Sequence, residues 1–91
     1  MSRVGRRVRV TGRVQGVFFR AWTAEQAVSL RVTGWVRNCP DGSVEAHLAG
    51  EPKAIEQLTE LLRRGPPAAH VASVEIDEVA PGDSARFEIR H

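Results

Sequence analysis

The spacing of apolar residues switches twice along this chain between the period of a strand and the period of a helix. Val8 and Val10 alternate with polar residues, which is the pattern of a half-buried strand. Ala21, Ala24 and Val28 then recur at helical spacing. The predicted elements, in chain order, are a strand over 7–14, a helix over 21–30, strands over 32–38 and 43–49, a helix over 52–64, a strand over 71–79 and a short terminal strand around Phe87 and Ile89.

Turn residues separate these elements. Pro40-Asp41-Gly42 predicts a tight turn, so the second and third strands form a hairpin. Pro52 suits the first turn of a helix, and Gly65 ends it. The order β-α-β-β-α-β predicts an α+β, ferredoxin-like fold, in which two helices cover one face of a four-stranded antiparallel sheet of order 4-1-3-2. We expect residues 1–91 to form a single domain, because this length is below that of two ordinary domains.

This topology brings two distant segments to one edge of the sheet. The first and second strands run in the same direction with the third between them, so their ends lie on the order of 10 Å apart. The residues from Gln15 to Arg20 should therefore face the residues near Asn38. A long side chain and a small anion would fill the gap between them.

The segment Gly12–Arg20 joins the first strand to the first helix and contains no proline, so all of its backbone N–H groups are available as donors. A loop that opens a helix suits an anion, because its N–H groups converge and the helix dipole adds partial positive charge. Arg20 would add a planar guanidinium that can hold two phosphate oxygens. The loop alone leaves a second interpretation open, in which Gly16 only permits a turn and Arg20 only faces solvent.

A second segment favours the anion site. Gly12–Arg20 matches the pattern Gly-x-Val-Gln-Gly-Val-x-Phe-Arg, and Gly34–Asn38 matches Gly-aromatic-Val-basic-Asn, with Gly42, Val44 and Gly50 following. With these two motifs at the right separation, and over nearly its whole length, the chain resembles the acylphosphatase family.

The resemblance implies metal-independent hydrolysis of a carboxyl-phosphate anhydride, with no cofactor. Arg20 would bind the phosphoryl group, and Asn38 would orient the attacking water. The substrate would be a small acyl phosphate, and inorganic phosphate would be both product and competitive ligand. The phosphate-binding residues would be Gln15, Gly16, Val17, Phe18, Phe19 and Arg20.

The charge distribution suggests an alternative function, that of a nucleic-acid-binding protein. Residues 1–24 contain six arginines and no acidic residue, although the whole chain carries a net charge of only +2. Such a segment on this fold could bind nucleic acid. However, the third strand has no aromatic ring on which a base could stack, and the chain has no tyrosine. We therefore predict no nucleic-acid partner, and we expect Arg7, Arg9 and Arg13 to lie on a solvated face.

Other chemistries lack their required residues. A thiol phosphatase that used Cys39 would need arginine six positions later, where Glu45 stands. The three histidines, His47, His70 and His91, have no paired spacing for a metal, so we predict no metal site. Lys53 is not part of a Walker A loop.

The single cysteine excludes a disulfide framework and is compatible with a reducing compartment. No apolar run resembles a signal peptide or a membrane span, and the strand period of residues 7–14 argues against an amphipathic transit peptide. We expect a cytoplasmic monomer without membrane contact. Related domains also occur inside larger maturation enzymes, but the length favours a free-standing protein.

One residue departs from the family pattern. Family members often have glycine where the first helix turns into the second strand, and this chain has Arg31 at that position. If the site requires positive φ, Arg31 is strained by about 1 kcal/mol. The expected consequence concerns stability and leaves the site residues unchanged.

Overall fold

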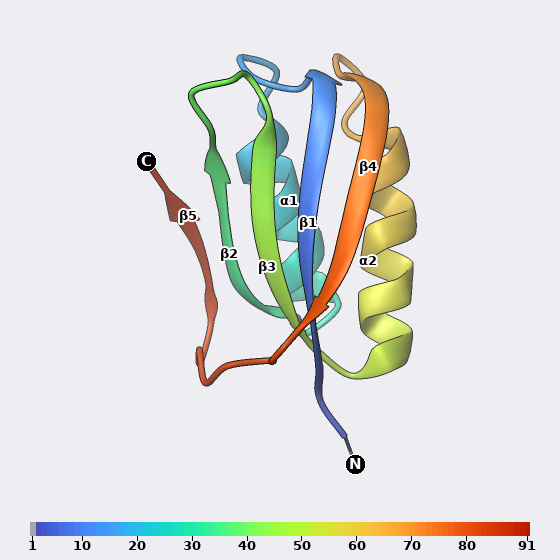
Figure 1. The fold of residues 1–91 in the computed structure, drawn as a ribbon, viewed down its shortest axis with the longest axis vertical. Helices are drawn as coiled ribbons and strands as arrows, with labels where there is room; N and C mark the ends of the chain where they lie inside the picture. The colour runs from blue at the N-terminus through green and yellow to red at the C-terminus, as the bar shows by residue number, and fades with distance from the viewer. Residues whose placement is uncertain (1) are drawn as a thin grey trace.

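The computed structural model describes residues 2–91, which form one sheet with two helices packed against one of its faces (Figure 1). Each helix covers part of the sheet: α1 packs on β2 and β5, and α2 packs on β1, β3 and β4. The other face of the sheet carries no helix. The elements are β1 (Val4–Arg13), α1 (Phe19–Ser29), β2 (Thr33–Asn38), β3 (Val44–Gly50), α2 (Pro52–Arg64), β4 (His70–Val79) and β5 (Phe87–Arg90).

The strand order is β4-β1-β3-β2-β5. The predicted antiparallel order 4-1-3-2 is confirmed, and so is the short strand around Phe87 and Ile89. The prediction counted four antiparallel strands in the sheet. The structure adds β5 as a fifth strand, which runs parallel to β2 and makes the sheet mixed. Its register pairs Gly34 with Phe87 and Val36 with Ile89 along the edge of β2 that β3 leaves free. Sequence pattern predicted the strand but not its partner, because such pairing is fixed by tertiary contacts.

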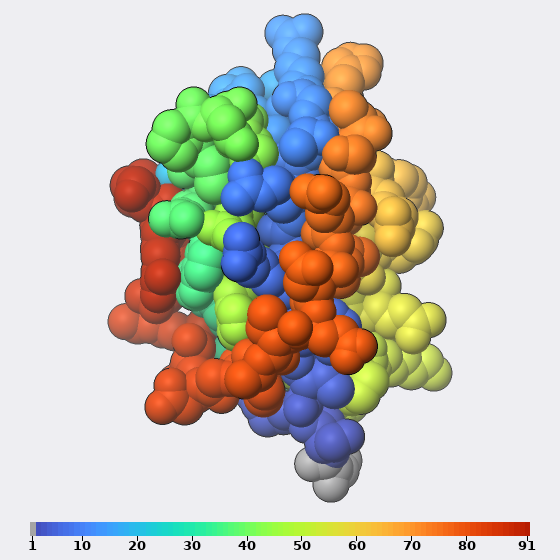
Figure 2. Space-filling model, viewed as in Figure 1, coloured from blue at the N-terminus to red at the C-terminus, as the bar shows by residue number. Residues whose placement is uncertain are grey.

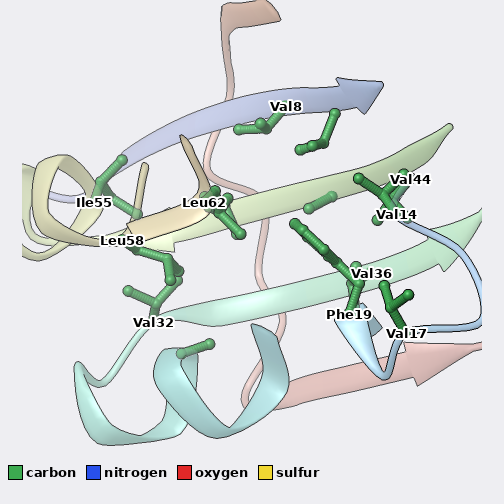
Figure 3. Packing of buried hydrophobic residues seen from close by; sticks show 14 residues of the cluster. Val8, Val14, Val17, Phe19, Val32, Val36, Val44, Ile55, Leu58 and Leu62 are labelled. Atoms are coloured by element: carbon green, nitrogen blue, oxygen red, sulfur yellow. The ribbon is translucent and has the colours of Figure 1, made fainter. Parts of the chain in front are cut away.

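The core lies between the sheet and the helices (Figure 3). Val8, Val36 and Leu48 come from the sheet, and Leu58 comes from α2; none of the four is measurably exposed. Phe19, the first residue of α1, is also buried and belongs to the same core cluster (Figure 3). This anchoring fixes where α1 begins, one residue before Arg20.

Gly34 allows the close approach of β2 and β3. Its φ is +132°, and a Cβ at this position would collide with the carbonyl oxygen of His47. Any other residue would separate the two strands or shift their register. The glycine therefore helps to fix the position of Asn38 at the end of β2.

The end of α1 is a Schellman motif centred on Arg31. The N–H of Val32 donates to the carbonyl oxygen of Ala27 at 2.8 Å, and the N–H of Arg31 donates to that of Val28 at 3.1 Å. Arg31 has φ of 59°, so this position does adopt the positive φ that the sequence left open.

Candidate active site

The β1–α1 loop and the β2–β3 hairpin lie at the same end of the sheet (Figure 1). The Gln15 side chain joins them: its Nε2 donates to the carbonyl oxygens of Cys39, at 2.8 Å, and Ser43, at 2.9 Å. Both acceptors belong to the hairpin turn that follows Asn38. The loop that precedes Arg20 and the strand end that carries Asn38 are therefore tied together by a direct contact.

The hairpin turn has its own hydrogen bonds. Asp41 Oδ1 accepts from the backbone N–H of Ser43 at 2.9 Å and from its hydroxyl at 2.6 Å, and the N–H of Gly42 donates to the carbonyl of Cys39 at 3.1 Å. The hydrogen bonds from the Ser43 side chain and backbone lower the pKa of Asp41 below its ordinary value of 3.8. The turn thus closes on an ionised carboxylate, next to the strand end that holds Asn38.

The β1–α1 loop presents unpaired backbone donors. Gly16 has φ of 74° and Phe18, the N-cap residue, has φ of 64°. A Cβ added at Gly16 would meet no atom within 4 Å, so the space beside it is open. Among the hydrogen bonds found for residues 2–91, none uses the N–H groups of Gln15 to Phe19 as donors. Free N–H groups at the start of a helix are well suited to an anion.

Arg20 lies in the first turn of α1 and reaches the end of β5. Its Nη1 is 3.0 Å from the carbonyl oxygen of Arg90, to which it donates, and 3.2 Å from Nδ1 of His91. It makes no ion pair with any carboxylate of residues 2–91. The guanidinium is thus held at one nitrogen by the Arg90 carbonyl oxygen and the His91 ring, and no ion pair within residues 2–91 compensates its charge.

A pocket of about 370 Å³ lies beside Arg20. Gly16, Phe18, Phe19, Arg20 and Asn38 line it, so both motifs contribute to one site. Among the predicted phosphate-binding residues, Gln15 and Val17 do not line it: the Gln15 side chain turns to the hairpin, and Val17 is buried in the core. The remaining lining residues are Val14, Ala21, Ile89 and His91.

Sequence reasoning did not predict Ile89 and His91 as part of this site. They reach it because β5 lies along β2, on the side of the sheet that α1 covers. The alternation of Phe87 and Ile89 was the available signal, but it predicted only a strand. The pairing of that strand with β2 is what brings it to the pocket.

A larger hollow, of about 430 Å³, lies beside Leu30 and Arg31 at the other end of α1. Neither Arg20 nor Asn38 lines it. If size were the criterion, this hollow would be chosen as the active site. Of the two, however, it is the smaller pocket that brings together the free N–H groups of the loop, the guanidinium of Arg20 and the amide of Asn38.

Two arginines of β1, Arg7 and Arg9, are paired with acids on the face of the sheet without helices, which Figure 2 views directly. Arg7 Nε lies 2.8 Å from buried Glu45, and Arg9 Nη1 lies 3.1 Å from Asp41. Arg37 also binds Glu45, at 2.7 Å, and the hydrogen bond and charge of that carboxylate raise the pKa of Arg37. The charges of Arg7, Arg9 and Arg37 are therefore compensated, whereas Arg13 is exposed and makes no ion pair within residues 2–91.

The same face holds Trp35, which stacks on His47 with ring centroids 6.2 Å apart. The guanidinium groups of Arg37 and Arg90 lie over the Trp35 ring, 5.6 Å and 4.8 Å from its centroid. Trp22 packs instead on the core, 5.6 Å from Phe19. These contacts assign both tryptophans a packing role.

Within residues 2–91, no group of three or more His, Cys, Asp or Glu side chains is arranged to hold a metal ion. The thiol of Cys39 is buried and unpaired with another cysteine. Among the helices of the same residues, none is both long and apolar enough to cross a membrane.

Comparison with known proteins gives a consistent result. The acylphosphatase family model matches residues 6–89. An acylphosphatase of Anaeromyxobacter dehalogenans is 52% identical over 90 residues, covering 98% of this chain and 97% of the other, and one of Rhizorhabdus wittichii is 51% identical over 81 residues, covering 89% and 81%. The solved structure of an acylphosphatase from Coxiella burnetii superposes with a TM-score of 0.94 at 42% identity, over 97% of this chain and 93% of that one.

Proposed function

The chain belongs to the acylphosphatase family and hydrolyses carboxyl-phosphate anhydrides, and on that premise we propose that Arg20 binds the phosphoryl group while Asn38 orients the attacking water. The observation that carries this proposal is that Arg20, Asn38 and the open loop at Gly16 line one pocket. The resemblance implied these two roles, and the shared pocket supports them.

Phosphoryl binding would use two kinds of donor. The free N–H groups from Gln15 to Phe19 would receive phosphate oxygens at the positive end of the α1 dipole. Arg20 would donate to other phosphate oxygens through the guanidinium N–H groups that do not contact Arg90. Because no carboxylate of residues 2–91 pairs with Arg20, a dianionic phosphoryl group would not have to displace one.

Asn38 would hold the nucleophile. Its amide makes no side-chain hydrogen bond within residues 2–91, and it lies at the end of β2 in the same pocket. An amide binds water through either its oxygen or its nitrogen, and it does not repel phosphate as a carboxylate would. Attack of the water oxygen on phosphorus forms the new P–O bond. The bond to the acyl oxygen breaks, its electron pair leaves with the carboxylate, and the water proton passes to a phosphate oxygen.

The reaction would need neither a general acid nor a metal. A carboxylate is a stable leaving group at neutral pH, so the protein has only to align water with phosphorus and stabilise charge on the equatorial oxygens. The donors described above supply that stabilisation. Inorganic phosphate, which has the same oxygens, would bind the same site as product and inhibitor.

Hydrolysis of an aryl acyl phosphate after exhaustive EDTA treatment tests the proposal. We expect full turnover with EDTA present and competitive inhibition by inorganic phosphate. Activity that disappears with EDTA and returns with a divalent ion would contradict the metal-free mechanism, and noncompetitive inhibition by phosphate would contradict the shared site.

We also propose an oligomeric state and a cellular compartment for the enzyme. Both sequence motifs line one pocket within a single chain, so neither motif has to be supplied by a second copy, and we propose that the enzyme is a monomer. The lone cysteine, Cys39, is buried and free, which supports a reducing compartment such as the cytoplasm. Sedimentation with and without phosphate checks the monomer: a dimer that forms only with phosphate would contradict it.

A further inference from the structure

Two exposed apolar side chains border the phosphate site. The structure exposes three large hydrophobic residues to solvent among residues 2–91: Phe18 at 83%, Val28 at 67% and Ile89 at 39%. Phe18 and Ile89 both line the pocket that contains Arg20 and Asn38, whereas Val28 lies farther along α1 and does not. The exposure of apolar surface is therefore concentrated at the site.

Phe18 occupies its position at a cost to stability. Its φ of 64° is a left-handed conformation that glycine and asparagine adopt more readily than phenylalanine. It is also the N-cap residue of α1 and provides no side-chain cap, which Ser, Thr, Asp or Asn would provide. Neither the backbone nor the helix explains a phenyl ring here, and strain of this kind is concentrated at functional sites.

Ile89 approaches the pocket from a different element. It pairs with Val36 of β2 and lies on the side of the sheet that α1 covers. The next residues of the chain, Arg90 and His91, contact Arg20 through the Arg90 carbonyl oxygen and His91 Nδ1. Phe18, two residues before Arg20 on the loop, and Ile89, on β5, thus place apolar surface next to the phosphoryl-binding group.

We propose that Phe18 and Ile89 form the binding surface for the acyl group and select acyl phosphates whose acyl group is apolar and large, such as an aromatic ring. The acyl carbon is one oxygen atom away from phosphorus, so a phosphate held by Arg20 brings the acyl group against whatever borders the site. Burial of a ring against these two side chains stabilises the bound substrate through the hydrophobic effect and ring packing. This inference rests on the proposed function, because it assumes that Arg20 holds the phosphoryl end.

The test compares benzoyl phosphate with acetyl phosphate, which share the phosphoryl group and differ in the acyl group. The measured quantity is the kcat/KM for benzoyl phosphate divided by the kcat/KM for acetyl phosphate. Phe18→Asn keeps a residue that tolerates positive φ and removes the ring, and Ile89→Thr keeps a β-branched strand former. We expect the ratio to fall about tenfold in Phe18→Asn and about threefold in Ile89→Thr, from the apolar area each removes.

Val28→Ala is the matched control, because it shortens the exposed apolar side chain that lies outside the pocket. It should leave the ratio unchanged. A ratio that stays within about twofold of wild type in both pocket variants would overturn the inference. An equal fall in Val28→Ala would also overturn it, because the effect would not then belong to the pocket.

Failure of the proposed function would look different. A wild-type protein that hydrolyses neither substrate, or an Arg20→Lys variant that retains full activity on both, would contradict the phosphoryl site itself. A wild-type protein that hydrolyses both substrates, with a ratio insensitive to Phe18 and Ile89, would contradict only the acyl-group surface.

Discussion

The two ends of helix α1 resemble each other in geometry and differ in chemistry. Each end has a non-glycine residue with positive φ, Phe18 at the start and Arg31 after the end, and each end borders a hollow of several hundred cubic ångströms. At the C-terminal end, the Schellman hydrogen bonds satisfy the carbonyl groups of Ala27 and Val28. At the N-terminal end, the N–H groups of the loop and the charge of Arg20 have no such partners.

This difference shows why hollow size and backbone strain do not by themselves identify a site. The larger hollow lies beside the satisfied end, and the smaller pocket lies beside the unsatisfied one. Converging backbone donors and an arginine without a counterion are the groups that an anion binds. The same reasoning separates Arg20 from Arg7 and Arg9, which bind Glu45 and Asp41.

Arg20→Lys, at the N-terminal end of α1, should cause the largest change in activity among these variants. Lysine keeps the charge at the N-terminal end and loses the planar fork, so kcat/KM should fall about a thousandfold and phosphate inhibition should weaken markedly. Steady-state kinetics with phosphate as inhibitor measure both changes. Arg7→Lys is the matched control, because Arg7 already pairs with Glu45, and it should retain wild-type kinetics. Similar losses in the two variants would mean that general positive charge, and not the guanidinium of Arg20, serves the site.

Asn38→Ala tests the other side of the pocket. We expect kcat to fall about a hundredfold, because the water loses its alignment with phosphorus, while the inhibition constant of phosphate changes little. Full inhibition curves for wild type and variant separate the two effects. Parallel loss of turnover and phosphate affinity would show that Asn38 helps to build the anion site.

Arg31→Gly should act at the C-terminal end of α1 and only on stability. Glycine adopts the positive φ of the Schellman position without strain, so the free energy of unfolding should rise by about 1 kcal/mol. Urea unfolding measures this change, and kcat/KM should equal that of wild type. A loss of activity would indicate that the two ends of the helix are coupled, and a loss of stability would show that Arg31 is not strained.

The smallest effect should come from Asp41→Asn in the hairpin that supports Asn38. The pKa of Asp41 is lowered in the folded state, so its ionised form stabilises the fold above about pH 3.8, its ordinary pKa, and that contribution is lost as pH falls through the folded pKa. Wild type should exceed the variant slightly in urea midpoint at pH 7, and the difference should vanish in acid. A difference that stays constant as the pH falls from 7 into strong acid would assign the effect to something other than this ionisation.

Local patterns predicted most of the fold. The alternation in β1, the Pro40-Asp41-Gly42 turn and the Gly65 helix end predicted the elements, because each depends on neighbouring residues, and the order 4-1-3-2 followed from the ferredoxin-like fold that this sequence of elements favours. The expected helix end identified Arg31 as the position where φ could be positive, and the structure decides that it is. The parallel pairing of β5 with β2 did not follow, because an edge strand is placed by contacts between residues far apart in the sequence.

In the candidate site, too, features carried by a local motif were predicted and features that depend on distant contacts were not. The two motifs predicted Arg20 and Asn38, and the structure brings both to one pocket. Ile89 and His91 were missed because they arrive with β5. Gln15 was predicted to bind phosphate through its backbone N–H, which remains a prediction, and the role of its side chain in holding the hairpin was missed. The pairing of Arg7 and Arg9 with acids depends on cross-strand register, which the net charge of the segment does not reveal.

The most direct test of this account is a crystal structure of the protein with inorganic phosphate bound. We predict one phosphate at the N-terminal end of α1, with its oxygens within hydrogen-bonding distance of the N–H groups from Gln15 to Phe19 and of the Arg20 guanidinium, and with Asn38 across the pocket. Phosphate bound instead beside Arg31, or on the face that carries Arg7 and Arg9, with the loop empty, would contradict it.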